Sequence, residues 1–503
     1  AYGWTQGWTT ARSKTSGGGF PLIPKPSTCY GCPFNTLSKW FTPDEYVEGA
    51  EVLVLSQNPG EDEEQGRRLT HYDMDGRRSY EPCQPSPLTG TTGYDLTRKY
   101  LPLAGLERGK DVSLANPIRC RPHGRNDLPP VTDKTLRQAV EHCQFHHYKP
   151  PASTRLVIAE GAYALFASTG EDGTESPGHK INRGVEGWRG WLLPWNPPPR
   201  ARVTFNDVWV PSSTPSSSPW VLPTYHLAYL YRAPWYTPVS QRDWSKVQAI
   251  LQGKWPEPFP EIHPLPPETW PRRSAFDTEF YPGADGTDQL VRYSLAWRGR
   301  QGEPYLHVVE ADNLVQPVTI PPEITTVFHQ VESDVGHLRG LLNPGTKVSI
   351  EDTMYLHAVL WPDLDHTLDF LGSLYARTNR WKHLLRTNPR VYSGGDALGT
   401  WDSFVPLEAE RDRDPRVRKV YYEYQLPLAS IIHKSRRYGL RVVPDRVDAA
   451  LRSFDTAQAD QEMAAQAHSG WPINLGSSQQ VARELYEVEA VHLNPITGRV
   501  RRA

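Results

Sequence analysis

The stretch Ser274–Phe280, S-A-F-D-T-E-F, places Asp277 and Glu279 two residues apart within a short apolar run. Alternate side chains of a β-strand share a face, so a strand here would bring both carboxylates to the same face. Two carboxylates flanked by Phe276 and Phe280 would repel each other unless a divalent cation lay between them. Such oxygen ligands suit Mg²⁺ or Mn²⁺, which act on phosphate esters. A lone D-x-E more often marks a solvated strand edge, so this prediction depends on acids elsewhere.

Further acids follow at suitable places. Asp334 lies in F-H-Q-V-E-S-D, at the start of a helix predicted over 334–342. Tyr392 precedes Asp396 by four residues in V-Y-S-G-G-D. A D-x-E, a later Asp and a Y-x-x-x-D in this order resemble the three exonuclease motifs of the DnaQ-like proofreading domain of family A DNA polymerases, over about Arg273–Leu407.

This resemblance implies an RNase H-like α/β exonuclease domain that removes nucleotides from the 3′ end of DNA. It also takes in Asp352–Pro362, which is similar to the family's segment between its second and third motifs. By analogy, two Mg²⁺ or Mn²⁺ ions bind here and Tyr392 orients the attacking water. The implied metal ligands are Asp277, Glu279, Asp334 and Asp396. The second motif departs from the family's H-N-x-x-F-D, because Gln330 and Ser333 stand at the Asn and Phe positions.

Composition sets broad limits. A length of 503 residues suggests two to four domains, and a hydrophobic content of 38% with 17 Trp and 24 Tyr is enough for buried cores. The net charge of −2 does not decide nucleic-acid binding, because an acidic metal site can offset a basic groove. No apolar run reaches the ~18 residues of a membrane span. The start of the chain has no signal-peptide pattern and no Met, so either Met was removed or the chain begins inside a longer product.

The five cysteines are too few for a disulfide scaffold, which predicts a reducing, cytoplasmic location. All five precede residue 144. Cys29 and Cys32 form a C-x-x-C, and with Cys120 and Cys143 they make a plausible four-thiolate site for zinc or an iron–sulfur cluster. Three histidines around Cys143 keep a mixed zinc site open: His142, His146 and His147.

A second set of motifs surrounds these cysteines. A predicted buried strand, Val52–Leu55, leads into a tight turn at Pro59-Gly60, which would place polar side chains at the mouth of an α/β sheet. The motifs that follow are Pro87–Gly93, Asn116–Pro122, Leu156–Leu165 and Pro223–Arg232. In this order the set resembles the iron–sulfur uracil-DNA glycosylases, over about Ser27–Arg232.

That family cleaves an N-glycosidic bond after base flipping, and its fold is an α/β sandwich with a parallel sheet. The resemblance implies a 4Fe–4S cluster on Cys29, Cys32, Cys120 and Cys143, with zinc as the alternative. It implies a water-positioning loop at Gln57–Gly60, a base-reading amide at Asn116, and His226 as hydrogen-bond donor to the departing base. Leu88 stands where the family has an aromatic residue that stacks on the base.

The glycosylase motifs also depart from the family. Gln57 replaces the Glu that orients water, whereas Asn58 resembles the G-x-N-P-G of mismatch-specific glycosylases. An insertion between Arg67 and Pro87 carries Cys83, whose role the sequence does not indicate. Two hypotheses therefore stand together: an active glycosylase, and a glycosylase-like domain kept for DNA or subunit binding.

Proline-rich stretches divide the chain. Pro194–Pro219 is predicted to be a surface loop, and Lys254–Pro271 an extended, semi-rigid linker. After the third exonuclease motif, Val420–Val442 resembles a polymerase helix that ends in Gly, and Trp471–Tyr486 the thumb, with Ser477 or Ser478 as helix cap. Thr497–Val500 resembles the hairpin before the palm. The predicted domains are 1–250 (glycosylase-like), 251–272 (linker), 273–418 (exonuclease) and 419–503 (helical start of the thumb).

We find no palm or finger motif in the sequence. The leading hypothesis is therefore the exonuclease-bearing, amino-terminal part of a bacteriophage-type family A DNA polymerase, which acts on single-stranded or frayed DNA. Polymerisation would then require a palm-and-fingers partner or a missing carboxyl-terminal half. Phage origin follows only from the fusion of the two motif sets. The alternatives are a uracil-DNA repair glycosylase with an accessory nuclease, and a catalytically silent DNA-binding or assembly subunit of a split polymerase.

Overall fold

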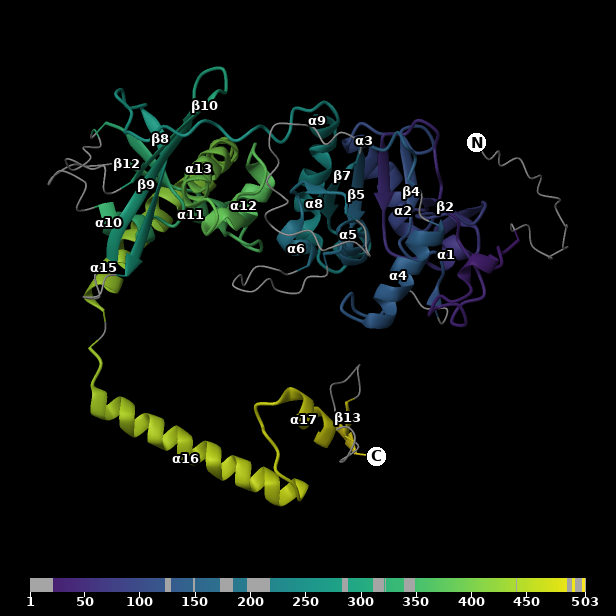
Figure 1. The fold of residues 1–503 in the computed structure, drawn as a ribbon. Coiled ribbons are helices and arrows are strands. Elements are labelled where there is room, and N and C mark those ends of the chain that lie inside the picture. The colour runs from purple at the N-terminus through teal and green to yellow at the C-terminus, as the bar shows by residue number, and fades with distance from the viewer. Residues whose placement is uncertain are drawn as a thin grey trace. The chain divides into compact units, whose positions relative to one another are not determined.

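A computed structural model gives the fold (Figure 1). It describes residues 21–122, 128–147, 150–171, 184–196, 218–282, 288–310, 321, 323–338, 349–439, 441–485, 491–493 and 500–502. Packing divides the chain into two units, 1–430 and 431–503. The larger unit contains two five-stranded sheets, and the protein is an α/β protein with more than one sheet. Within this unit we call the described part of 21–255 the first lobe, because Trp255 still packs in its core, and that of 256–430 the second lobe. The domain bounds expected from sequence remain predictions.

The first lobe is built on a sheet with strand order β4-β1-β5-β7-β6. The first four strands of that order are parallel, and β6 is antiparallel to β7. The strands are β1 (Val52–Leu55), β4 (Val112–Ala115), β5 (Leu156–Glu160), β6 (Leu193–Pro194) and β7 (Trp220–Thr224). The predicted strand at Val52–Leu55 is thus confirmed.

Helices cover both faces of this sheet, which explains why all four residues of β1 are buried. Leu53 and Leu55 pack with α4 (Lys134–His147) and α5 (Gly161–Thr169). On the opposite face, Val52 and Val54 pack with α3 (Leu101–Leu103), α8 (Thr237–Ser245) and α9 (Val247–Leu251). The other helices of this lobe are α1 (Glu61–Glu64), α2 (Thr91–Asp95), α6 (Val185–Trp188) and α7 (Leu227–Leu230). The insertion that carries Cys83 includes an antiparallel hairpin of β2 (Arg67–Tyr72) and β3 (Arg78–Pro82).

The second lobe is built on a mixed sheet with strand order β10-β9-β8-β11-β12. Its strands are β8 (Arg273–Pro282), β9 (Asp288–Arg298), β10 (Pro304–Glu310), β11 (Thr325–Phe328) and β12 (Ser349–Asp352). Strand β8 pairs antiparallel with β9 and parallel with β11. The long helix α13 (Pro389–Arg411) packs on this sheet, where Phe404 and Leu407 share a core with Phe276 and Leu295. The other helices of this lobe are α10 (Val331–Leu338), α11 (Thr353–Leu360), α12 (Leu368–Tyr375), α14 (Pro415–Val420) and the first residues of α15 (Leu426–Tyr438), which continues into the smaller unit.

The helix predicted over 334–342 begins three residues earlier than expected, at Val331. The cause is tertiary. The carboxylate of Asp352, far along the chain, accepts a hydrogen bond from the Val331 N–H at 2.6 Å and so satisfies a free donor of the first turn. Asp352 also caps α11 by accepting from the Tyr355 N–H at 3.0 Å. Residues 339–342 lie outside the described part of the chain.

The predicted linker, Lys254–Pro271, contains no helix or named strand. It runs along the second lobe through isolated β-bridges between Glu257 and Thr378 and between His263 and His307. Of the predicted loop at 194–219, residues 197–217 lie outside the described part.

The smaller unit contains α16 (Pro444–Ser469), α17 (Ser478–Arg483) and an antiparallel pair of β13 (Val491–Leu493) and β14 (Val500–Arg502). Ser477 caps α17, as predicted, because its hydroxyl accepts from the Gln480 N–H at 3.4 Å. The helix α15 gives way to Gly439, whose φ of +65° favours glycine. Most of Thr497–Val500 lies outside the described residues. None of the described helices combines the length and apolar character that a bilayer span requires.

Candidate functional site

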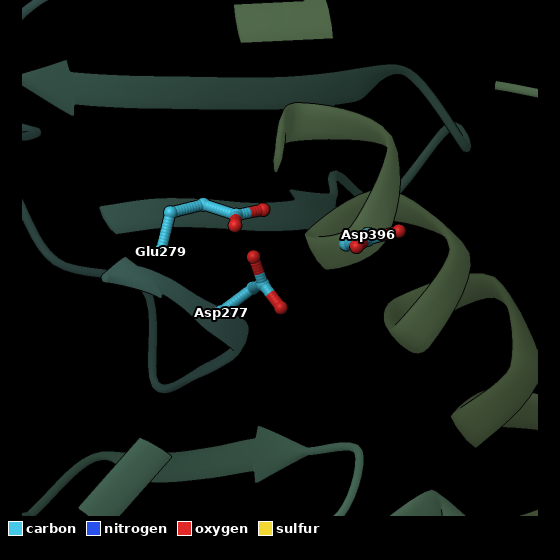
Figure 2. A group of neighbouring side chains, drawn as sticks. All are labelled: Asp277, Glu279 and Asp396. Atoms are coloured by element: carbon cyan, nitrogen blue, oxygen red, sulfur yellow. The ribbon is translucent and has the colours of Figure 1, made fainter. Parts of the chain in front are cut away.

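Three carboxylates meet where strand β8 faces helix α13. Asp277 and Glu279 alternate with Thr278 on β8, so they lie on the same face of the sheet. Asp396 comes from α13, one turn after Tyr392. One ligand oxygen from each of the three acids lies within 4.8 Å of the others, and Figure 2 shows the three side chains turned toward a common space. Asp396 is buried, whereas Asp277 and Glu279 keep partial exposure.

These acids are crowded and poorly solvated. Burial, and then the charges of Asp396, Asp334 and Glu279, hold the pKa of Asp277 well above its usual range. Burial and Asp396 likewise raise the pKa of Glu279 to about 7. The Oδ2 atom of Asp277 is buried and has no hydrogen-bond partner within the described chain. A divalent cation would relieve this repulsion and satisfy that oxygen, so the donor set fits Mg²⁺ or Mn²⁺.

Asp334 lies beside this group and is engaged differently. Its Oδ1 accepts hydrogen bonds from the backbone N–H and the hydroxyl of Thr278, at 2.9 and 2.7 Å. Burial raises its pKa to about 8, although the bonds from Thr278 oppose that effect. Asp334 contributes charge to the pKa of Asp277 but is not part of the group whose oxygens lie within 4.8 Å.

Two residues that sequence reasoning missed hold Asp396 in place. Its Oδ1 accepts a hydrogen bond from the indole N–H of Trp381 at 2.6 Å and lies 2.6 Å from Nζ of Lys382. Burial alone would lower the pKa of Lys382, but the charge of Asp396 raises it above the ordinary value. Nζ of Lys382 also lies 3.5 Å from the hydroxyl of Tyr392, the residue expected to orient water. No spacing rule connects residues 381 and 382 to Asp396, so the sequence carried no signal for them.

The predicted glycosylase residues surround a cavity of about 710 Å³ at the carboxyl ends of the parallel strands. Polar groups gather there because the strand ends of an open α/β sheet leave a crevice. The structure brings together at this cavity all the residues predicted for this site: Gln57, Asn58, Leu88, Asn116 and His226. Leu88 is buried and has a φ of +54°, an uncommon conformation for a non-glycine residue.

The tautomer of His226 follows from its contacts. Its Nδ1 accepts a hydrogen bond from the Ala228 N–H at 3.1 Å, so the neutral ring carries its proton on Nε2. That Nε2 lies 3.1 Å from the hydroxyl oxygen of Ser56, which therefore accepts. Burial, with a smaller contribution from Arg232, lowers the pKa of His226 to about 4. At neutral pH His226 is thus an uncharged hydrogen-bond donor.

Four of the cysteines share one region of the first lobe. Burial raises the pKa of the Cys29 thiol to about 11, and the next largest contribution comes from Cys143. Burial raises the pKa of Cys120 to about 12, and Cys143, Cys32 and Cys29 add to that shift. All five cysteines are free, and the charges that act on Cys83 come from none of the other four.

The positions of these four thiols can be compared with those of the ligands in a zinc site. Four sulfurs on one zinc ion lie ~3.8 Å apart, since each Zn–S bond is ~2.3 Å long. Among the described residues, the acidic triad is the one group of three or more His, Cys, Asp or Glu with ligand atoms within 4.8 Å of one another. Within the described residues no three of these thiols are gathered that tightly, while Nε2 of His147 lies 3.6 Å from Sγ of Cys29.

Comparisons with known proteins add little to this geometry. No protein-family model matches the chain, and no curated protein matches it. Among solved structures, the POL domain of Pol1 from M. smegmatis in complex with DNA primer-template and dNTP is similar at a TM-score of 0.32 and 17% identity, over 43% of this chain and 37% of that one. The catalytic core of RRP6 from Trypanosoma brucei is similar at a TM-score of 0.25 and 19% identity, over 31% of this chain and 45% of that one. The chain thus spans less than half of either structure, and both TM-scores are too low to carry an argument.

The buried carboxyl of Glu160, at the end of β5, predicts a pH dependence of stability. Burial raises its pKa to about 8, and the Ser56 hydroxyl opposes this only in part. Because the folded-state pKa lies above the unfolded value, this group stabilises the fold at low pH, and that stability is lost as pH rises through about 8. We expect the unfolding free energy to fall by a few kcal/mol (~1.4 for each pKa unit) between pH 5 and 9, and Glu160→Gln to flatten this slope.

Urea unfolding at several pH values measures this effect, with Glu48→Gln, a change at an exposed carboxylate, as the matched control. A variant at Glu160 with the wild-type slope would show that Glu160 does not titrate in this range.

Proposed function

We propose that this chain is a metal-dependent nuclease that removes nucleotides from the 3′ end of DNA, the exonuclease-bearing part of a family A-type DNA polymerase. The observation that carries the proposal is the convergence of Asp277, Glu279 and Asp396 within 4.8 Å, from a strand and a helix more than a hundred residues apart in sequence. The mixed sheet beneath them is consistent with the RNase H-like fold that the motifs resemble.

In this proposal Asp277, Glu279 and Asp396 hold two Mg²⁺ or Mn²⁺ ions, with Asp334 as a further ligand. The bound ions supply positive charge that stabilises the attacking and leaving oxygens of the phosphodiester. The protein supplies orientation. Trp381 and Lys382 fix one oxygen of Asp396, which leaves Oδ2 free of both contacts. We propose that the phenol of Tyr392, 3.5 Å from Nζ of the same Lys382, orients the attacking water molecule.

The experiment is direct. Purified full-length chain is incubated with 5′-labelled single-stranded DNA and Mg²⁺ or Mn²⁺, and with the same strand in a duplex with a frayed 3′ end. We expect a ladder of products that shorten from the 3′ end, and no products in EDTA. Absence of shortening with either metal would contradict the proposal. A role in proofreading, and a partner that carries the palm and fingers, follow only if this activity is found.

A second candidate function rests on the first lobe. The cavity of about 710 Å³ contains the neutral donor His226 and the amide of Asn116, the two kinds of group that base recognition and stabilisation of a departing base anion require. We propose that this cavity accepts a flipped base, and that Cys29, Cys32, Cys120 and Cys143 hold a 4Fe–4S cluster, with zinc as the alternative. Such a cluster would cross-link the amino-terminal segment to α4.

Uracil release separates an active pocket from a binding module. We expect wild-type protein to release uracil from single-stranded DNA, and Asn58→Ala to reduce release at least ~100-fold because water is no longer positioned. Exonuclease rates provide the internal control, since Asn58 lies in the other lobe. Asp277→Asn should show the reverse pattern. A wild-type protein that binds uracil-containing DNA without releasing base would instead support the binding module.

A further inference from the structure

The indole of Trp381 packs against three glycines, Gly372, Gly395 and Gly399, and we call this packing site the tryptophan seat. A Cβ added at Gly395 or Gly399 of α13 would lie 2.3 or 2.4 Å from its ring atoms, and one at Gly372 of α12 would lie 2.8 Å away. Trp381 is 1% exposed. The ring therefore lies directly against the backbones of two helices, in an orientation that its neighbours define closely. In this orientation its N–H reaches Oδ1 of Asp396.

The fourth side of this seat comes from the first lobe. Trp191, also 1% exposed, meets Trp381 edge-on, with ring centroids 5.8 Å apart and an interplanar angle of 85°. Its ring also approaches the Cβ position of Gly372, at 3.2 Å. Two reciprocal hydrogen bonds fix the position of Trp191 relative to the second lobe. The N–H of the next residue, Leu192, donates to the side chain of Asn379 at 3.2 Å, and Asn379 Nδ2 donates to the Leu192 carbonyl at 3.0 Å.

We propose that the first lobe is a positioning element of the metal centre: Trp191 holds Trp381 in its seat, and Trp381 holds the carboxylate of Asp396 in the orientation that binds metal. This inference rests on the proposed function, because it takes Asp396 as a ligand. It assigns to the first lobe a role in the nuclease centre that is independent of any glycosylase activity. Hydrogen bonds to a ligating carboxylate orient it, and their loss typically costs ~10- to 100-fold in metal affinity.

The contact surface between the two lobes offers a matched control for the variants of Trp191, because some of its hydrogen bonds do not involve Trp381. The indole N–H of Trp255 donates to the Ala376 carbonyl at 3.1 Å. Nζ of Lys246 donates to the carbonyls of Gly190 and Ser373, at 2.7 and 2.6 Å. Trp255→Phe therefore weakens the attachment of the lobes but leaves the seat of Trp381 intact.

The test measures Mn²⁺ binding to the full-length, DNA-free chain by electron paramagnetic resonance of free Mn²⁺, alongside the Mn²⁺ dependence of exonuclease rate. We expect Trp381→Phe, which keeps a ring but loses the N–H, to bind Mn²⁺ ~10- to 100-fold more weakly. Trp191→Ala should weaken binding in the same direction, by ~3-fold or more, because the indole of Trp381 loses its support. Trp191→Phe should restore near-wild-type binding, and Trp255→Phe should leave the Mn²⁺ affinity unchanged.

Folded Trp191→Ala protein that binds Mn²⁺ as tightly as wild type would overturn the inference. So would Trp255→Phe protein that loses as much affinity as Trp191→Ala, since general loosening of the lobes would then explain the effect. If Trp191→Ala does not fold, Trp191→Leu takes its place, and the same comparison with Trp191→Phe decides. Wild-type protein that binds no Mn²⁺ would overturn the metal centre itself, and that result is distinguishable because it does not depend on the variants.

Discussion

Asp277→Asn is expected to abolish metal-dependent shortening of DNA and at the same time to stabilise the metal-free protein. The loss of activity should be ~1,000-fold or more, which corresponds to ~4 kcal/mol of transition-state stabilisation, because a neutral amide cannot replace a carboxylate between two cations. The gain in stability follows from the pKa of Asp277, which burial and the charges of Asp396, Asp334 and Glu279 hold well above its usual range. Catalysis and stability thus favour different residues at this position.

The stability effect has a definite pH dependence. Below the ordinary carboxyl pKa of ~3.9, Asp277 is protonated in both the folded and the unfolded chain and resembles Asn, so the two proteins should unfold at similar temperatures near pH 4. As pH rises above that value, Asp277 ionises more easily in the unfolded chain than in the folded protein, which costs the wild type stability that the variant keeps. We therefore expect the variant to unfold at least ~2 °C higher at pH 8 in EDTA.

Thermal unfolding in EDTA and in Mn²⁺ measures both effects on the same samples. Mn²⁺ should raise the unfolding temperature of the wild type and leave that of the variant nearly unchanged. Asp363→Asn, at an exposed carboxylate outside the metal centre, is the control for the charge change itself. Retention of Mg²⁺-dependent shortening by Asp277→Asn would remove this residue from the proposed mechanism.

Gly395→Ala is expected to destabilise the second lobe by ~1–3 kcal/mol, although Ala normally stabilises a helix by up to ~1 kcal/mol relative to Gly. The sign is reversed because the new methyl group would lie 2.3 Å from the ring of Trp381. Displacement of that ring should also weaken Mn²⁺ binding, since the indole N–H would no longer meet Asp396.

A double-mutant comparison tests the cause. The cost of Gly395→Ala should be smaller when Trp381 is already replaced by Leu, because the atoms that clash are then absent. Equilibrium unfolding of the four proteins provides the coupling free energy. A Gly395→Ala protein more stable than wild type would show that helix propensity, rather than the tryptophan seat, governs this position.

Several features of the candidate site could be predicted from the sequence, and each depends on local geometry. The two-residue spacing of Asp277 and Glu279 is enough to place them on one face once β8 is a strand. The apolar run at Val52–Leu55 indicated a strand covered on both sides, and the cap at Ser477 followed from residue type. The start of α10 was misplaced because its capping group, Asp352, comes from another element.

The residues that surround Asp396 could not be predicted from the sequence. Trp381 and Lys382 lie before α13 begins at Pro389, and Trp191 lies in the other lobe, so no periodicity could associate them with Asp396. From the sequence alone, the three glycines of the seat would only be expected to lower the stability of two helices, because Gly has a low helix propensity. The structure shows that they leave room for the indole of Trp381.

By itself, the sequence determined which side chains share a face of a strand or a turn of a helix, because those relations follow from backbone periods of 2 and 3.6 residues. Only the tertiary structure decided which acids come within reach of one cation, that Asp334 is engaged by Thr278, and that a tryptophan of the first lobe lies against the residue that orients Asp396. Those relations depend on the packing of elements far apart in the chain, and packing is set by shape and burial across the whole fold rather than by any local pattern.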